Sequence, residues 1–126
     1  REKGVVRIVG DGGNRWPLVH VEDLAELQVA LLGRAEPGTV VNAAAESAPT
    51  VREIAAAAAE AAGVPGRVEV WALEDARARF GPYADALAMD QQVSSELAKR
   101  LFGWSPSRTG ILEELRGGSY AVRPEL

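Results

Sequence analysis

NRWPLVHVEDLA, residues 14–25, is the stretch of sequence that decides the fold of this chain. Pro17 cannot donate a backbone hydrogen bond, so the apolar run at residues 18–21 is expected to form a strand that starts at an edge or a bulge. A helix then opens at Asp23, because leucines recur at helical spacing from this point until Gly33. The stretch therefore predicts a strand that turns directly into an amphipathic helix.

The segments on either side extend this pattern. Residues 39–44 are short, apolar and flanked by turn residues, which fits a buried strand, so residues 19–44 are expected to be half of a βαβ unit. Upstream, the β-branched run at residues 5–9 predicts a strand that ends in a tight turn at residues 10–14. The chain is therefore predicted to be of the α/β class.

The remaining sequence predicts several helices and one further strand. Thr50 and Glu53 have the spacing of a capping box, in which each side chain bonds the backbone amide of the other residue. The later elements are expected in this order: a helix at 51–62, a strand at 67–71, a helix at 73–80, a helix from Ser94 or Ser95 to Phe102 ended by Gly103, and a helix from 110 to about 119 capped by Thr109.

Composition limits the classes of function. The 126 residues suffice for one domain or part of one, and they carry a net charge of −4, which disfavours nucleic acid or an anionic membrane as a partner. The chain has no cysteine, which excludes disulfides and thiolate metal sites and suits the cytoplasm. The Ala-rich run at residues 54–62 is too short to span a bilayer. Arg1 leads directly into the first predicted strand, so the chain is expected to be the middle or end of a larger protein.

The glycine-rich run at residues 10–14 is predicted to be a simple turn. A dinucleotide-binding fingerprint needs a third glycine where Arg15 stands, and it needs a helix N-terminus where Pro17 and a strand follow.

Three residues are candidate contacts of a small-molecule substrate. Arg15 can pair with a phosphate and Trp16 can stack on a ring, although a surface arginine and a core tryptophan are the plainer alternatives. Asn42 ends a predicted parallel strand, where open α/β sheets place ligand-binding groups, or it caps a turn.

His20 and Asp23 are assigned supporting, structural positions. His20 is the single histidine and lies in an apolar strand, without a nucleophile motif for a catalytic triad or enough ligands for a metal. The acidic Asp23 suits the positive end of the helix that it opens. No metal site is expected.

VHVEDLA at residues 19–25 and LFGWSP at residues 101–106, in this order, resemble the C-terminal half of the extended short-chain dehydrogenase/reductase family, which includes NAD-dependent sugar-nucleotide epimerases and dehydratases. The resemblance implies that residues 18–46 supply the closing helix and strand of a Rossmann-type sheet. Residues 1–17 and 47–126 would then form a small substrate-binding lobe. NAD or NADP would be bound mainly by an N-terminal part.

The catalytic motifs of this family are absent from the chain. Tyr83 is followed by Leu87 and Tyr120 by Pro124, so neither tyrosine belongs to a Tyr-x-x-x-Lys pair, and no catalytic residue is assigned here. In many sugar-nucleotide members an arginine four residues before the histidine binds the diphosphate, and this place is taken by Trp16. The resemblance therefore implies a substrate from the broader class of carbonyl or hydroxyl compounds, rather than a sugar nucleotide in particular.

Two hypotheses follow from the resemblance. In the first, the chain is the substrate-binding part of an NAD(P)-dependent oxidoreductase, epimerase or dehydratase, and it is not competent alone. In the second, it is a non-catalytic module of the same fold that senses cofactor or mediates association. Exposed strand edges invite pairing, so we also expect a homodimer or a swapped assembly.

Overall fold

The computed structural model describes residues 4–45, 48–108 and 110–118. They form two compact units. The first, called the sheet unit, contains the described residues within 1–16, 49–91 and 110–126. The second, called the α1 unit, contains those within 17–48 and 92–109.

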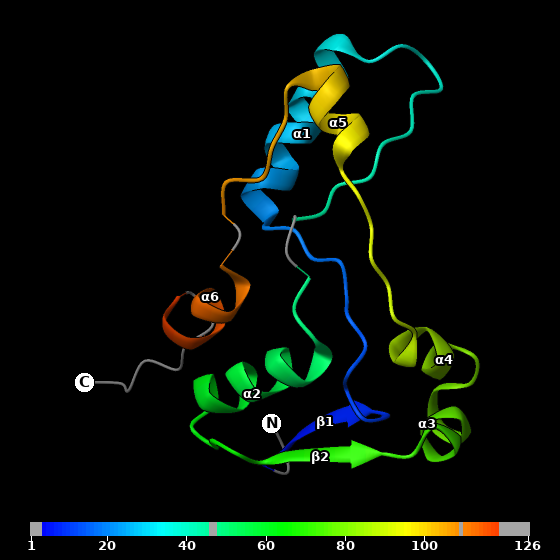
Figure 1. Cartoon of the computed structure of the whole chain (residues 1–126), viewed down its shortest axis with the longest axis vertical. Helices are drawn as coiled ribbons and strands as arrows, with labels where there is room; N and C mark the ends of the chain where they lie inside the picture. Colours follow the sequence, from blue (N-terminus) through cyan, green and yellow to red (C-terminus); the bar gives the residue numbers. More distant parts are fainter. Residues whose placement is uncertain (1–3, 46–47, 109, 119–126) are drawn as a thin grey trace. The chain divides into compact units, whose positions relative to one another are not determined.

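Two parallel strands form the centre of the sheet unit (Figure 1). β1 (Val6–Val9) and β2 (Val68–Trp71) pair in a register that places Val6 opposite Val68 and Val9 opposite Trp71. Both strands were predicted from their β-branched residues, and both predictions are confirmed. The pairing joins segments that lie about sixty positions apart in the sequence. Local sequence patterns could not indicate that these two strands are partners.

Helix α2 (Val51–Ala61) packs against the sheet through the buried side chains of Ile8, Val51 and Ala55. The predicted capping box starts this helix: Thr50 Oγ1 accepts from the Glu53 amide at 3.2 Å, and Glu53 Oε2 accepts from the Thr50 amide at 2.8 Å. These bonds satisfy backbone groups that lack partners in the first turn of a helix. The capping prediction is confirmed.

Helix α6 (Ile111–Gly117) lies against α2, and Arg116 Nε contacts Glu60 Oε2 at 2.6 Å. It corresponds to the last predicted helix. The proposed cap, Thr109, lies outside the described residues, and Gly110 occupies the N-cap.

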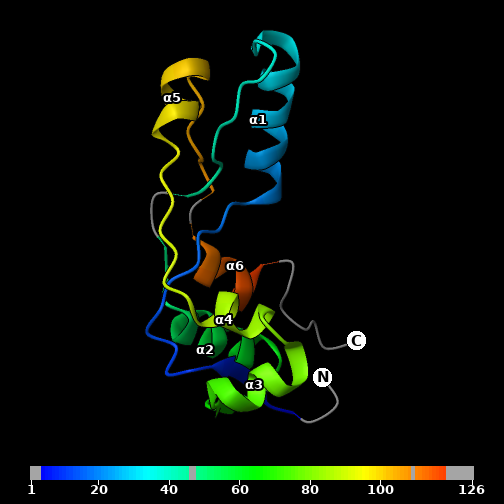
Figure 2. The same cartoon turned by 90° about the vertical axis from the view of Figure 1, so that its right-hand side faces the viewer.

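Helices α3 (Leu73–Phe80) and α4 (Tyr83–Ala88) follow the carboxyl end of β2 and face the viewer in Figure 2. Both helices pack small residues on Val9, which forms a cluster with Ala76 and Ala84. The sequence predicted α3 with these bounds but missed α4. Pro82 ended the preceding helix in that prediction, whereas it directly precedes α4, where the fixed φ of proline suits the start of a new helix.

The α1 unit is built on α1 (Val21–Arg34) and α5 (Glu96–Phe102), which pack through Leu27, Ala98 and Trp104. Helix α1 begins two residues before the predicted Asp23. Gly103 ends α5 in the left-handed conformation, with φ of 65°. This confirms the predicted glycine terminator.

The strands predicted at residues 18–21 and 39–44 are wrong. Residues 17–20 and 39–45 are not strand in the structure, and residue 21 already belongs to α1. One backbone hydrogen bond joins the two segments in the described part of the chain, from Ala45 N to Leu18 O at 2.7 Å. A ladder needs a series of such bonds, so these apolar runs do not pair as a sheet.

Residues 18–46, for which the closing elements of a Rossmann-type sheet were predicted, lie within the range of the α1 unit. Residues 92–109 were predicted to belong to the substrate-binding lobe. In the structure they belong to the α1 unit, because α5 and Trp104 share the apolar cluster of α1.

No helix among the described residues is both long enough and apolar enough to cross a lipid bilayer.

Candidate functional site

The glycine-rich turn at residues 10–13 uses its polar groups internally. Gly13 N donates to Asp11 Oδ1 at 2.8 Å, and Gly12 O accepts from Arg52 N at 3.0 Å. A Cβ on Gly12 would lie 2.6 Å from Ile8 Cδ1, so this glycine is required by packing against the sheet unit itself. Residues 14–20, which follow the turn, are not helical, so the turn does not fit a dinucleotide phosphate, whose cradle needs amides at a helix N-terminus.

Arg15 is held in place by its backbone. Its amide donates to Asp90 Oδ1 at 2.7 Å, its carbonyl accepts from Gln91 N at 2.9 Å, and it forms an isolated antiparallel bridge with Thr50. The residue is exposed. These contacts involve the main chain of Arg15 and fix the end of the turn.

Trp16 is half-buried in the sheet unit. Its indole Nε1 donates to Leu87 O at 3.2 Å, and its ring packs against the cluster of Ile8, Val51 and Ala55. The hydrogen bond fixes the orientation of the ring, because a buried indole N–H must find an acceptor. Trp16 is thus a core residue whose ring is held in a fixed orientation.

A cavity of about 360 Å³ opens beside Trp16 within the sheet unit. It is lined by two strand segments and by α3 and α4, through Arg7, Ile8, Val9, Trp16, Trp71, Arg79, Phe80 and Leu87. Arg15 is not among these residues. The structure therefore separates the side chains of the two neighbours that the sequence grouped together.

Arginines and aromatic rings meet at one side of this cavity. The guanidinium of Arg7 lies 4.9 Å from the centroid of the Trp71 ring, and that of Arg79 lies 5.8 Å from the Phe80 ring. The rings of Trp71 and Phe80 are 5.8 Å apart. Such cation–π contacts hold a positive charge next to an apolar surface.

Asn42 belongs to the α1 unit, so no single unit contains all three predicted substrate contacts. Its side chain is exposed, and Nδ2 donates to Ser94 O at 3.5 Å. Ser95 lies nearby and bonds both backbone groups of Ala44, accepting from N at 2.6 Å and donating to O at 2.8 Å. Asn42 thus helps to join the extended segment before residue 45 to the start of α5.

The α1 unit has a cavity of its own, of about 380 Å³. Its polar wall comes from the residues just before and within α5, including Ser94, Ser95 and Lys99, and its apolar wall includes Trp104 and Pro106. Asn42 is not among the lining residues.

His20 is the N-cap of α1. Its Nδ1 accepts from the backbone amide of Glu22 at 3.2 Å, so it takes the place that a serine or aspartate usually fills. This bond lets the helix begin at Val21.

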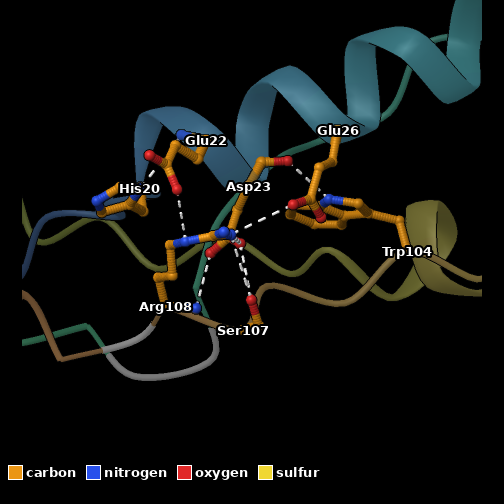
Figure 3. A network of polar contacts seen from close by, with 7 residues as sticks. All are labelled: His20, Glu22, Asp23, Glu26, Trp104, Ser107 and Arg108. Carbon is orange, nitrogen blue, oxygen red and sulfur yellow. Dashed lines mark hydrogen bonds and ion pairs between the residues drawn. The ribbon is translucent and has the colours of Figure 1, made fainter.

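Asp23 is fully buried and forms the centre of a polar network (Figure 3). Its carboxylate accepts from Ser107 Oγ at 3.1 Å, from Arg108 N at 2.9 Å and from Arg108 Nη1 at 2.7 Å. Its backbone carbonyl accepts from Trp104 Nε1 at 2.8 Å. The segment after α5 is therefore fastened to the first turn of α1.

The guanidinium of Arg108 contacts three carboxylates in this network. Arg108 also contacts Glu22 Oε2 at 2.8 Å and Glu26 Oε1 at 3.3 Å. Burial raises the pKa of Asp23, but the hydrogen bonds from Arg108 and Ser107 lower it more, so the pKa lies below its ordinary value. The carboxylate is therefore ionised at neutral pH and stabilises the contact rather than exchanging protons.

Arg108 and the cavity residues Trp71, Arg79 and Phe80 were not among the predicted site residues. A signal was available for the cavity: Trp71, Arg79 and Phe80 fall within a short strand and the helix directly after it. No local signal connects Asp23 with Arg108.

Among the described residues, no three His, Asp or Glu side chains gather as a possible metal site.

No protein-family model matches the chain. An uncharacterized protein of Schizosaccharomyces pombe is 32% identical over 120 residues, which cover 95% of this chain and 40% of that protein. The chain therefore spans less than half the length of this relative.

Solved structures match over nearly the whole chain. The structure of the human epimerase family protein SDR39U1 with NADPH is similar with a TM-score of 0.77 and 23% identity, over 94% of this chain and 40% of that one. A dTDP-glucose 4,6-dehydratase from Bacillus anthracis in complex with NAD is similar with a TM-score of 0.64 and 20% identity, over 91% and 34% of the two chains. The chain therefore has the mixed α/β fold of one part of the epimerase and dehydratase structures, which is the extended short-chain dehydrogenase/reductase fold that its sequence resembles.

Proposed function

We propose that this chain is the substrate-binding part of an NAD(P)-dependent oxidoreductase, epimerase or dehydratase of the extended short-chain dehydrogenase/reductase family. One observation carries the proposal: 94% of the chain matches 40% of a protein in complex with NADPH, at a TM-score of 0.77. A match of this extent to part of a larger fold supports a role as part of a larger enzyme.

The proposal divides the work between this chain and the rest of the protein. No Tyr-x-x-x-Lys pair occurs in the sequence, and the turn at residues 10–13 does not fit a dinucleotide phosphate. The cofactor, which supplies or takes a hydride when bound, and the catalytic Tyr and Lys would therefore be contributed by another part of the protein. This chain would bind and orient the substrate, with Trp16, Arg15 and Asn42 as its candidate contacts.

One side of α1, called its outer face, is formed by exposed apolar residues. This supports the presence of a further layer of protein packed against it. Val21, Val29 and Leu32 are 72%, 70% and 90% exposed, and they fall within about 80° of one another on the helix. The buried residues Asp23 and Leu27 occupy the opposite side. A helix that is apolar on two sides is usually buried on both, so we infer that the dinucleotide-binding part covers this face.

The test uses the complete reading frame that encodes these residues. We expect it to contain Gly-x-x-Gly-x-x-Gly and Tyr-x-x-x-Lys motifs, and we expect the complete protein to bind NADPH or NADH in a titration of nicotinamide fluorescence. The 126-residue chain is the matched control and should bind neither. A complete protein that lacks both motifs and binds neither nucleotide would refute the proposal.

The same protein separates the catalytic role from that of a cofactor-sensing module. Substitution of the motif tyrosine by phenylalanine should abolish hydride transfer while nucleotide binding is retained. If the unmodified protein binds the nucleotide but transfers no hydride to a panel of carbonyl compounds, the non-catalytic hypothesis is favoured.

A further inference from the structure

We propose that the cavity of the sheet unit binds a small planar aromatic carboxylate, with the ring against the apolar wall and the carboxylate on the guanidinium of Arg79. The inference rests on the proposed function and deepens it, because it gives the chemical class of the substrate. It also makes a prediction for this chain alone, which can fail while cofactor binding by the complete protein succeeds.

The size and lining of the cavity set the shape of the ligand. About 360 Å³ is at the low end of small-molecule sites, which suits one or two fused rings. The apolar wall is formed by Ile8, Val9, Trp16, Phe80 and Leu87. A planar ring gains contact with such a wall while losing little conformational freedom, because it has few rotatable bonds.

Hydrogen bonds and an ion pair fix the part of the wall around Trp16 and Leu87 and the pairing of α3 with α4. Asn14 Nδ2 donates to Leu87 O at 3.0 Å and to Met89 O at 3.1 Å, and the Trp16 indole donates to Leu87 O as well. Arg77 Nε contacts Asp85 Oδ1 at 3.1 Å and so ties α3 to α4. Ordering these parts of the wall before binding lowers the entropic cost of binding a ligand there.

The charge of the ligand follows from the state of the two arginines. Arg7 Nε pairs with Glu69 Oε2 at 2.5 Å, so its charge is neutralised within the sheet. Arg79 stacks at 5.8 Å from Phe80 and 5.9 Å from Trp71 and has no carboxylate partner in the described ranges. A guanidinium in this position offers two parallel N–H donors to a carboxylate.

The same arrangement disfavours a nucleoside diphosphate in this cavity. A diphosphate needs several cationic or backbone donors, and the lining offers one arginine without a carboxylate partner together with mostly apolar side chains. A single carboxylate on an aromatic ring matches both the one charge and the apolar wall.

The experiment is isothermal titration calorimetry of the 126-residue chain with three probes: 2-naphthoate, the neutral 2-naphthamide and the non-aromatic cyclohexanecarboxylate. We expect saturable binding of 2-naphthoate and at least roughly tenfold weaker binding of the other two, because each lacks one of the two recognised features. Arg79→Gln should weaken 2-naphthoate to the level of 2-naphthamide. Arg79→Lys should restore part of the difference, since it returns the charge without the fork of donors.

Arg67→Gln is the matched control, because it removes an exposed arginine of the same unit that does not line the cavity. It should leave all three affinities unchanged, and circular dichroism should confirm that each variant is folded. The proposal is overturned if 2-naphthoate does not bind saturably, if it binds no more tightly than 2-naphthamide, or if Arg67→Gln weakens it as much as Arg79→Gln does.

Discussion

The buried carboxylate of Asp23 accepts a hydrogen bond from the backbone amide of Arg108 at 2.9 Å, across a sequence separation of 85 positions. The Arg108 side chain returns to the same carboxylate at 2.7 Å. One residue of α1 thus fixes both the main chain and the side chain of the segment that follows α5. The contact gives the α1 unit a tertiary link besides its small apolar cluster.

Asp23→Asn should destabilise the α1 unit by about 2 kcal/mol, because an amide cannot accept all the hydrogen bonds that the carboxylate accepts from Ser107 and Arg108. Hydrogen exchange of the α1 amides, followed by mass spectrometry, measures this unit separately from the other. We expect faster exchange throughout α1.

Glu26→Gln is the matched control for this substitution. Glu26 contacts the same guanidinium at 3.3 Å, but its side chain is 60% exposed, so its loss should cost less than about 0.5 kcal/mol. Equal effects of the two substitutions would contradict the central role of the buried carboxylate.

The stability of the α1 unit should decrease in acid. The pKa of Asp23 is lower in the folded chain than its ordinary value of 3.8, so the folded state binds its proton less readily than the unfolded state does. The stabilisation is therefore complete above about pH 4 and is lost as the pH falls through the folded pKa. Urea denaturation at pH 7, 4 and 2.5 measures it, and Asp23→Asn should flatten the decrease. An unchanged acid dependence in this variant would assign the effect to other carboxylates.

Two glycine substitutions should act in opposite directions. Gly33 lies within α1 without a positive φ, and a Cβ there meets no atom within 4 Å, so Gly33→Ala should stabilise by about 0.5 kcal/mol through helix propensity. Gly103 has equal space but a φ of 65°, so Gly103→Ala should destabilise by about 1 kcal/mol. Thermal unfolding measures both. The same sign for both would show that conformation does not decide the effect.

The 126-residue chain should self-associate, as a dimer or a swapped assembly, through the outer face of α1. Leu32 is 90% exposed there, and covering such an apolar face removes it from water. Light scattering across a concentration series should detect the assembly, and Leu32→Glu should shift it toward monomer. Ser105→Glu adds the same charge at an exposed position outside α1 and should leave the assembly unchanged. A monomer at all concentrations would exclude this association.

Local patterns in the sequence were sufficient for most of the secondary structure. The capping box at Thr50 and Glu53, the terminator at Gly103 and the bounds of α3 all depend on interactions between residues a few positions apart. Such interactions are present in the sequence itself, because a helix end is decided by its own neighbouring residues. The resemblance of residues 19–25 and 101–106 to the extended dehydrogenase/reductase family likewise pointed to the fold that the solved structures share.

Tertiary structure decided the features that depend on distant partners. Apolar runs at residues 18–21 and 39–44 met the pattern of strands, but a strand exists only where a ladder of hydrogen bonds is completed. The contact of Asp23 with Arg108 and the cavity around Trp16 and Arg79 likewise join segments that the chain keeps far apart. The sequence by itself determined most of the helices, with α4 as the exception, and how several of them begin or end, since those free energies are local. Only the folded structure determined which side chains share a site, because that depends on how the segments pack.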